Sequence, residues 1–141
     1  MKYYVTTVMP YVNEAVAMYH QLESKTKAEG LSKKGRKLFV KTKEAELKEK
    51  FDAEVKELNE TQGMLMIKLI ARQTGVNIYD MLSEYKSTLT ATKWLGWGKL
   101  HGFNINKRYA PEKEPMLENI MESLDYPLPS LYDEKQILTV N

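Results

Sequence analysis

Hydrophobic residues recur with a helical period along most of this chain. Near its start they are spaced three or four positions apart: Val5, Val8, Val12, Ala15, Tyr19 and Leu22. This spacing predicts an amphipathic helix over residues 3–27. Pro10 lies inside the pattern and leaves two alternatives. Either the helix begins near Met9 with Pro10 in its first turn, or a longer helix passes through Pro10 and kinks there.

A second, highly charged helix is predicted over residues 33–58, after a break at Gly30 and a candidate N-cap at Ser32. Its narrow apolar stripe almost continues into the apolar segment that follows. The pattern is therefore compatible with one bent helix over 33–74, or with two helices separated between Asn59 and Gly63.

Residues 62–74 are apolar on nearly every side over their first turns. A helix of this kind normally lies inside a protein, so we expect it at the centre of the fold. Gly75 is expected to end the helix in the left-handed conformation. Asn77 is then expected to cap a short helix in which Asp80 favours the positive end of the helix dipole.

Two further helices are predicted. One begins at Ser87 or Thr88 and is stopped by Gly102, and the last opens with Pro115 in its first turn. No window shows the alternation of a β-strand followed by a hairpin turn. The predicted fold class is therefore all-α, a compact bundle of five or six helices around the central helix.

Length and composition fit one globular domain. A chain of 141 residues can form a single core, and we expect a helical domain over 1–125 followed by an extended tail over 126–141. The net charge of +2 gives no strong overall attraction to nucleic acid or membrane. The sequence has no cysteine, no signal-peptide pattern at its start and no transmembrane segment.

Lys68 and Arg72 lie one turn apart in the otherwise apolar central helix. Two cations at this spacing could bind a carboxylate or phosphate. A structural ion-pair network, with Asp80 or a glutamate of the 33–58 helix as partner, is favoured over this, because a buried cation without a partner is costly. The candidate polar or anion-binding cluster comprises Lys68, Arg72, Gln62, Tyr79 and Asp80.

Trp94, Trp97 and His101 share one face of their predicted helix and form a candidate aromatic pocket. The same spacing serves equally well to fill a core, and we favour that interpretation. The sequence holds only two histidines and no zinc-binding or nucleophile motif. We therefore predict no catalytic residue, no metal and no cofactor.

The segment Gln62–Gly75 reads Q-G-x-L-x-I-K-L-I-x-R-x-T-G and is followed by Tyr79-Asp80. It resembles the core motif of an uncharacterised bacterial family, a domain of unknown function found mainly in Bacteroidetes. Weaker similarities extend the resemblance over roughly residues 4–124: Pro10-Tyr11, Trp94, Trp97 and Tyr109-x-Pro111. The chain departs from the family at residues 85–88, where small and glycine-rich residues are common. The resemblance implies a periplasmic or envelope location, and no known activity.

These observations predict a non-enzymatic structural or interaction module of the bacterial cell envelope, with an unknown protein partner and possible peripheral association with the envelope. The alternative is a helical nucleic-acid-binding protein, which would use the helix-turn-helix-like segment 63–86 or the basic run 33–43. The second helix of that segment carries Asp80 and Glu84 against Lys86, which is unfavourable beside phosphates. The basic run is favoured as the solvated start of a long helix.

Overall fold

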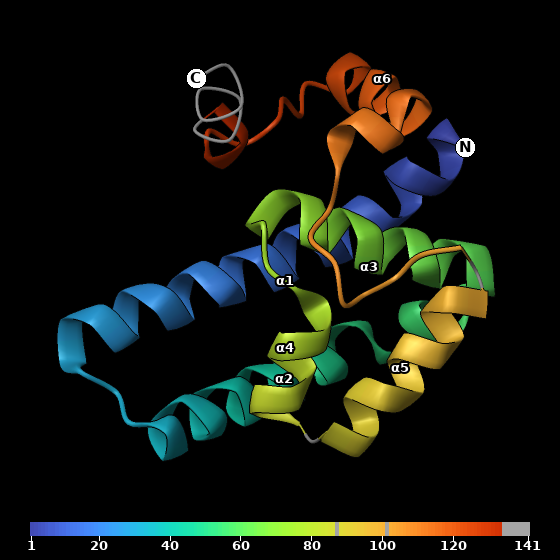
Figure 1. Cartoon of the computed structure of the whole chain (residues 1–141). Coiled ribbons are helices and arrows are strands. Elements are labelled where there is room, and N and C mark those ends of the chain that lie inside the picture. The colour runs from blue at the N-terminus through green and yellow to red at the C-terminus, as the bar shows by residue number, and fades with distance from the viewer. Residues whose placement is uncertain (87, 101, 134–141) are drawn as a thin grey trace.

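The computed structural model describes residues 1–86, 88–100 and 102–133. Within these ranges the chain is all-helical, which confirms the predicted fold class (Figure 1). The elements are α1 (Lys2–Glu29), α2 (Lys33–Lys56), α3 (Glu60–Thr74), α4 (Ile78–Tyr85), α5 (Thr88–Leu100), the 3-10 turn η1 (Pro111–Lys113) and α6 (Pro115–Ser123). Of the described helices, none is both long and apolar enough to cross a membrane.

The two longest helices, α1 and α2, form a hairpin whose turn lies at one end of the molecule (Figure 1). Gly30 leaves α1 with φ +61°, a left-handed conformation that favours glycine. The Ser32 hydroxyl oxygen then accepts a hydrogen bond of 3.1 Å from the Gly35 N–H, which confirms Ser32 as the cap of α2. In Figure 1, α4 crosses in front of α2, and it packs mainly against α5.

Helix α1 begins at Lys2 and passes through Pro10. The expectation of a start near Met9 is wrong, and the longer of the two alternatives is confirmed. Proline has no N–H, so the Thr6 carbonyl lacks its usual helical donor. An exposed surface helix tolerates this loss because water can reach the free carbonyl, and Thr6 itself is exposed.

Residues 33–74 form two helices, α2 and α3, rather than one bent helix. The break is fixed by reciprocal hydrogen bonds between Asn59 and Gln62. The Asn59 side chain accepts from the Gln62 N–H at 2.8 Å, while the Gln62 side chain accepts from the Asn59 N–H at 3.0 Å. This capping box satisfies two backbone donors that would otherwise be unpaired at the start of α3.

Helix α3 lies at the centre, packed along α1 on one side and crossed on another by the segment that follows α5 (Figure 1). Leu69 and Ala71 have no solvent exposure, and Leu65 is also buried. They join a core to which α1, α4, α6 and the intervening segments contribute: Val5, Val8, Val12, Ile78, Ile105, Tyr109, Leu117 and Met121. The predicted central position of this helix is confirmed.

The turns around α3 and α5 follow local backbone chemistry. Gly75 ends α3 with φ +70°, and the Asn77 side chain accepts from the Asp80 N–H at 3.0 Å at the start of α4. Within α5, a Cβ atom on Gly98 would lie 2.6 Å from the Phe103 carbonyl oxygen. Only glycine allows the 103–110 segment to approach α5 this closely. That segment leads the chain back across α3 towards α6.

After α6 the chain turns at Asp125, which has φ +63°, and runs back along the domain. Tyr132 is 6% exposed and belongs to the core, and the Leu131 side chain lies against Gly75. The part of the predicted tail that the structure describes, 126–133, therefore packs on the helical domain. Residues 134–141 lie outside the described ranges.

Candidate functional site

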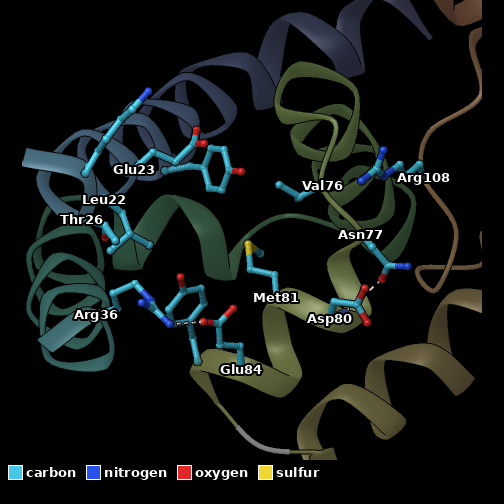
Figure 2. Close-up of a pocket in the computed structure, with 13 residues that line it drawn as sticks. Leu22, Glu23, Thr26, Arg36, Val76, Asn77, Asp80, Met81, Glu84 and Arg108 are labelled. Atoms are coloured by element: carbon cyan, nitrogen blue, oxygen red, sulfur yellow. Dashed lines mark hydrogen bonds and ion pairs between the residues drawn. The ribbon is translucent and has the colours of Figure 1, made fainter. Parts of the chain in front are cut away.

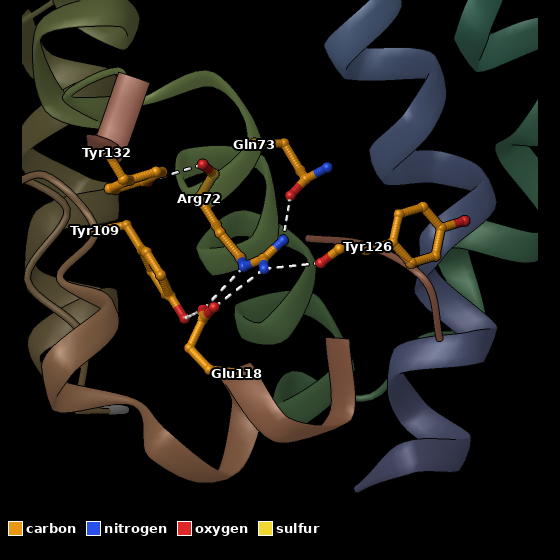
Figure 3. A network of polar contacts seen from close by, with 6 residues as sticks. All are labelled: Arg72, Gln73, Tyr109, Glu118, Tyr126 and Tyr132. Carbon is orange, nitrogen blue, oxygen red and sulfur yellow. Dashed lines mark hydrogen bonds and ion pairs between the residues drawn. The ribbon is translucent and has the colours of Figure 1, made fainter. Parts of the chain in front are cut away.

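The most buried charged group in the described structure is Arg72 of α3, which is 1% exposed. It forms a bidentate ion pair with Glu118 of α6: Nε donates to Oε2 at 2.9 Å, and Nη2 donates to Oε1 at 3.0 Å (Figure 3). Nη2 also donates to the Tyr126 carbonyl at 2.9 Å, and Nη1 donates to the Gln73 side-chain oxygen. The guanidinium is thus neutralised and almost fully hydrogen-bonded.

Two tyrosines complete this group, which we call the α3–α6 cluster: Arg72, Gln73, Tyr109, Glu118, Tyr126 and Tyr132 (Figure 3). The Tyr109 hydroxyl donates to Glu118, and the Tyr132 hydroxyl donates to the Arg72 carbonyl at 2.8 Å. Burial, reinforced by the hydrogen bond to Glu118, raises the pKa of Tyr109 well above its usual value. Burial also raises the pKa of Tyr132 to about 12. Both hydroxyls therefore remain protonated donors at neutral pH.

Lys68 lies one turn before Arg72 and has its own acidic partner. Its Nζ is 2.7 Å from Glu114 and 5.5 Å from the centroid of the Phe103 ring. Glu114 and Glu118 are spaced four residues apart, as are Lys68 and Arg72, so two cations face two carboxylates. The expected partners, Asp80 or a glutamate of α2, are wrong. The geometry forms a structural ion-pair network and leaves neither cation open to an external anion.

The remaining members of the predicted polar cluster lie elsewhere. Gln62 caps the start of α3, about 15 Å along the helix axis from Arg72. The Tyr79 N–H donates to the Ile105 carbonyl at 3.0 Å, and the Asp80 side chain is exposed on α4. The predicted five residues therefore do not form one site. Only Lys68 and Arg72 share an environment, and its acidic half comes from α6 and the residue just before it.

The predicted aromatic pocket is described only in part. Trp94 and Trp97 pack edge to face, with ring centroids 5.2 Å apart, and Trp94 is 38% exposed. A Cβ atom placed on Gly63 would lie 3.7 Å from the Trp97 ring, so this pair covers the start of α3. His101 lies outside the described residues.

A cleft with a volume of about 660 Å³ opens between α1, α2 and α4 (Figure 2). We call it the α1–α2–α4 cleft. Its apolar lining comes from one side chain of α1, one of the loop before α4 and one of α4: Leu22, Val76 and Met81. Arg36 and Arg108 stand at opposite ends in Figure 2. Sequence reasoning missed this cleft because α4, which forms one wall, is distant in sequence from the α1–α2 hairpin that forms the others.

The polar groups of the cleft carry charges of both signs. Arg36 Nη2 lies 3.0 Å from Glu84 Oε1 and links α2 to α4 (Figure 2). Arg108 makes no ion pair with any residue in the described ranges. Burial raises the pKa of both Tyr19 and Tyr85, and Glu23 and Glu84 respectively add to the effect. Two neutral hydroxyls, a paired arginine and an unpaired arginine thus surround an apolar floor.

The sequence profile of one known protein family matches residues 1–123, from the first residue to the end of α6. The chain belongs to this family. It is the DUF4294 family, a domain of unknown function. The DUF4294 match covers α1 to α6, but it ends before Tyr126 and Tyr132, so the α3–α6 cluster includes residues beyond the matched region. No curated protein and no solved structure matches the chain.

Proposed function

We propose that the protein is a non-enzymatic interaction module of the bacterial cell envelope, and that the α1–α2–α4 cleft binds a segment of a protein partner. The cleft itself carries this proposal. Its volume of about 660 Å³ lies within the range of about 300–1,000 Å³ that is typical of ligand sites. The lining combines three apolar side chains with ten polar or charged ones, which can fix the orientation of a bound molecule.

The chemistry of the lining suits a polypeptide segment better than a strongly charged ligand. The lining holds three acidic and three basic side chains, and Arg36 pairs with Glu84, so the cleft has no concentrated charge of one sign. Tyr19 and Tyr85 offer neutral hydroxyls that can bond with peptide N–H and C=O groups. Met81 offers a flexible apolar side chain that can adapt to a partner's side chain.

The buried polar residues support a non-enzymatic role. Arg72 and Lys68, the cations that the sequence singles out, are both committed to carboxylates of the same chain. A general acid or base needs a proton that can move to a substrate, and a nucleophile needs a base within hydrogen-bond reach. The polar groups around Arg72 instead hydrogen-bond to one another in the interior.

The envelope location rests on the family resemblance alone. Cell fractionation with an antibody against the native protein tests it. We expect the protein in the periplasmic or envelope fraction, and recovery with a cytosolic marker enzyme would contradict this part of the proposal.

Photocrosslinking tests the cleft. A photoreactive amino acid replaces Met81, inside the cleft, or Leu89, which is 68% exposed on α5. In native cells we expect a discrete adduct from position 81 that is absent from position 89 and weakened by Arg36→Glu. Thermal melts confirm that each variant is folded. Equal adducts at both positions, or none at position 81, would contradict the proposal.

The nucleic-acid alternative receives less support from the geometry. Helix α4 would be the recognition helix of the segment 63–86, but it packs against α5 and its Ile78 is 2% exposed. Asp80 and Glu84 would meet the phosphates of the backbone. The basic run over 33–43 lies outside the segment 63–86, so the geometry of α4 does not count against that run.

A further inference from the structure

The charges of the chain are unevenly distributed. Residues 25–43, around the turn of the α1–α2 hairpin, contain seven lysines and one arginine but a single acidic residue, Glu29, which gives this region a net charge of +7. The whole chain has a net charge of +2, so all other residues together carry −5. The small overall charge therefore hides a strongly basic end of the molecule.

One face of α2 concentrates this charge around an apolar side chain. Lys34, Leu38 and Lys41 follow each other at steps of four and three residues, and Lys37 lies beside them. All four side chains are exposed, and Leu38 is 65% exposed. Val40, on the opposite side of the helix, is buried. We call Lys34, Lys37, Leu38 and Lys41 the basic face.

The lysines of the basic face have no acidic partner in the described part of the chain. By contrast, their neighbours Lys25, Arg36 and Lys43 pair with Glu29, Glu84 and Glu46. The first turn of α2 also contains no acidic residue. Cations at a helix N-terminus oppose the helix dipole. These lysines therefore destabilise α2. An external anion bound beside them would reduce their repulsion by the positive end of the helix dipole and by one another.

We propose that the basic face docks on the surface of an anionic lipid bilayer. The three lysines contact headgroup phosphates, while Leu38 enters the boundary between headgroups and acyl chains, as the apolar residues of interfacial helices do. A phosphate surface alone accounts for the lysines but gives an exposed leucine no apolar environment. The lipid surface accounts for both. This proposal goes beyond partner binding in the cleft and does not depend on it.

Vesicle flotation with the full chain tests the proposal, using vesicles of phosphatidylglycerol mixed with phosphatidylcholine. One variant combines Lys34→Gln, Lys37→Gln and Lys41→Gln. Its matched control removes three exposed lysines elsewhere: Lys93→Gln, Lys99→Gln and Lys107→Gln. Leu38→Ser is compared with Leu89→Ser, because these leucines are 65% and 68% exposed. All these positions are at the surface, so thermal melts should show every variant folded, and the basic-face triple variant should melt at or slightly above the wild type because it no longer opposes the helix dipole.

We expect binding to the anionic vesicles that weakens as salt is added. The basic-face triple variant should bind roughly 100-fold more weakly, since each lysine near an anionic surface contributes about fivefold. Leu38→Ser should weaken binding several-fold, while Leu89→Ser and the control triple variant should not.

Three results would overturn the proposal. Equal binding to pure phosphatidylcholine would show that anionic headgroups are not recognised. An equal loss in the control triple variant would show that only overall charge matters. Retention on duplex DNA that Leu38→Ser leaves unchanged, without vesicle binding, would assign the basic face to nucleic acid. None of these results depends on crosslinking at Met81, so the two proposals fail separately.

Discussion

Arg72 and Glu118 are joined by two parallel hydrogen bonds across 46 residues of sequence. Arg72 is almost completely buried, and the side chain of Glu118 is 18% exposed. This pair fixes α6 to the central helix, because α6 otherwise makes its main helix contact with α1.

Arg72→Met should lower the free energy of unfolding by about 3 kcal/mol, because it leaves the partly buried Glu118 carboxylate without its cation and the Tyr126 carbonyl without a donor. Adding Glu118→Met should recover part of this loss, because no charge then remains unpaired. Urea denaturation measures both. Lys56→Met, which breaks an exposed pair with Asp52, should change stability by less than about 1 kcal/mol. An Arg72→Met variant as stable as the wild type would contradict a structural role.

Lys68→Met should have a smaller effect than Arg72→Met, about 1 kcal/mol or less, because Lys68 and Glu114 are 18% and 30% exposed. Glu114 already neutralises Lys68, so phosphate should raise the melting temperatures of wild type and variant equally. Thermal melts with phosphate, and with a chloride control of equal ionic strength, measure this. A stabilisation by phosphate that Lys68→Met abolishes would instead show an anion site.

Gly75→Ala should destabilise the protein by more than Gly30→Ala. Both glycines have positive φ angles, +70° and +61°, where alanine is disfavoured by about 1 kcal/mol. A Cβ atom on Gly75 would also lie 2.9 Å from Leu131 Cδ1, whereas nothing lies within 4 Å at Gly30. In a Leu131→Ala background, Gly75→Ala and Gly30→Ala should lower the free energy of unfolding, measured by urea denaturation, by the same amount. If the cost at Gly75 stays the same, Leu131 does not pack there in solution.

Stability should fall as the pH rises above about 10, the ordinary pKa of tyrosine. Folding raises the pKa of Tyr132 to about 12, so between these values the folded state retains a proton that the unfolded state has lost. The contribution is fully present below pH 10 and decreases by about 1.4 kcal/mol per pH unit up to about 12. Tyr109 acts in the same direction.

Tyr132→Phe should therefore flatten the alkaline decline when unfolding is measured by urea at a series of pH values. Tyr3→Phe is the matched control, because Tyr3 is 74% exposed. An alkaline slope that both substitutions change equally would contradict the buried hydroxyl of Tyr132.

Features set by nearby residues could be predicted from the sequence. Gly75 and Asn77 mark the end of one helix and the start of the next through their own backbone and side-chain chemistry, and the structure has both boundaries there. The apolar pattern leaves the break between α2 and α3 open, although Asn59 and Gln62 carry a local signal. Their spacing of three residues fits a capping box.

Features set by distant residues could not be predicted in the same way. Lys68 and Arg72 stand out in the sequence because cations are rare in an apolar helix, but their partners cannot be identified from it. Glu114 and Glu118 have the same four-residue spacing as Lys68 and Arg72, and this shared spacing is the signal in the sequence that points to the pairing. Choosing them over the other acidic residues requires knowing that the 103–110 segment returns the chain across α3. The α1–α2–α4 cleft was beyond prediction for the same reason.

The α3–α6 cluster also bears on where the domain should be cut for expression. The family match ends at Ser123, but Arg72 donates to the Tyr126 carbonyl and accepts from the Tyr132 hydroxyl. A gene fragment that stops at the family boundary would remove two of the five hydrogen bonds described for Arg72 and expose the core beside it. The folding unit that should be cloned, crystallised or labelled therefore includes Tyr126 and Tyr132.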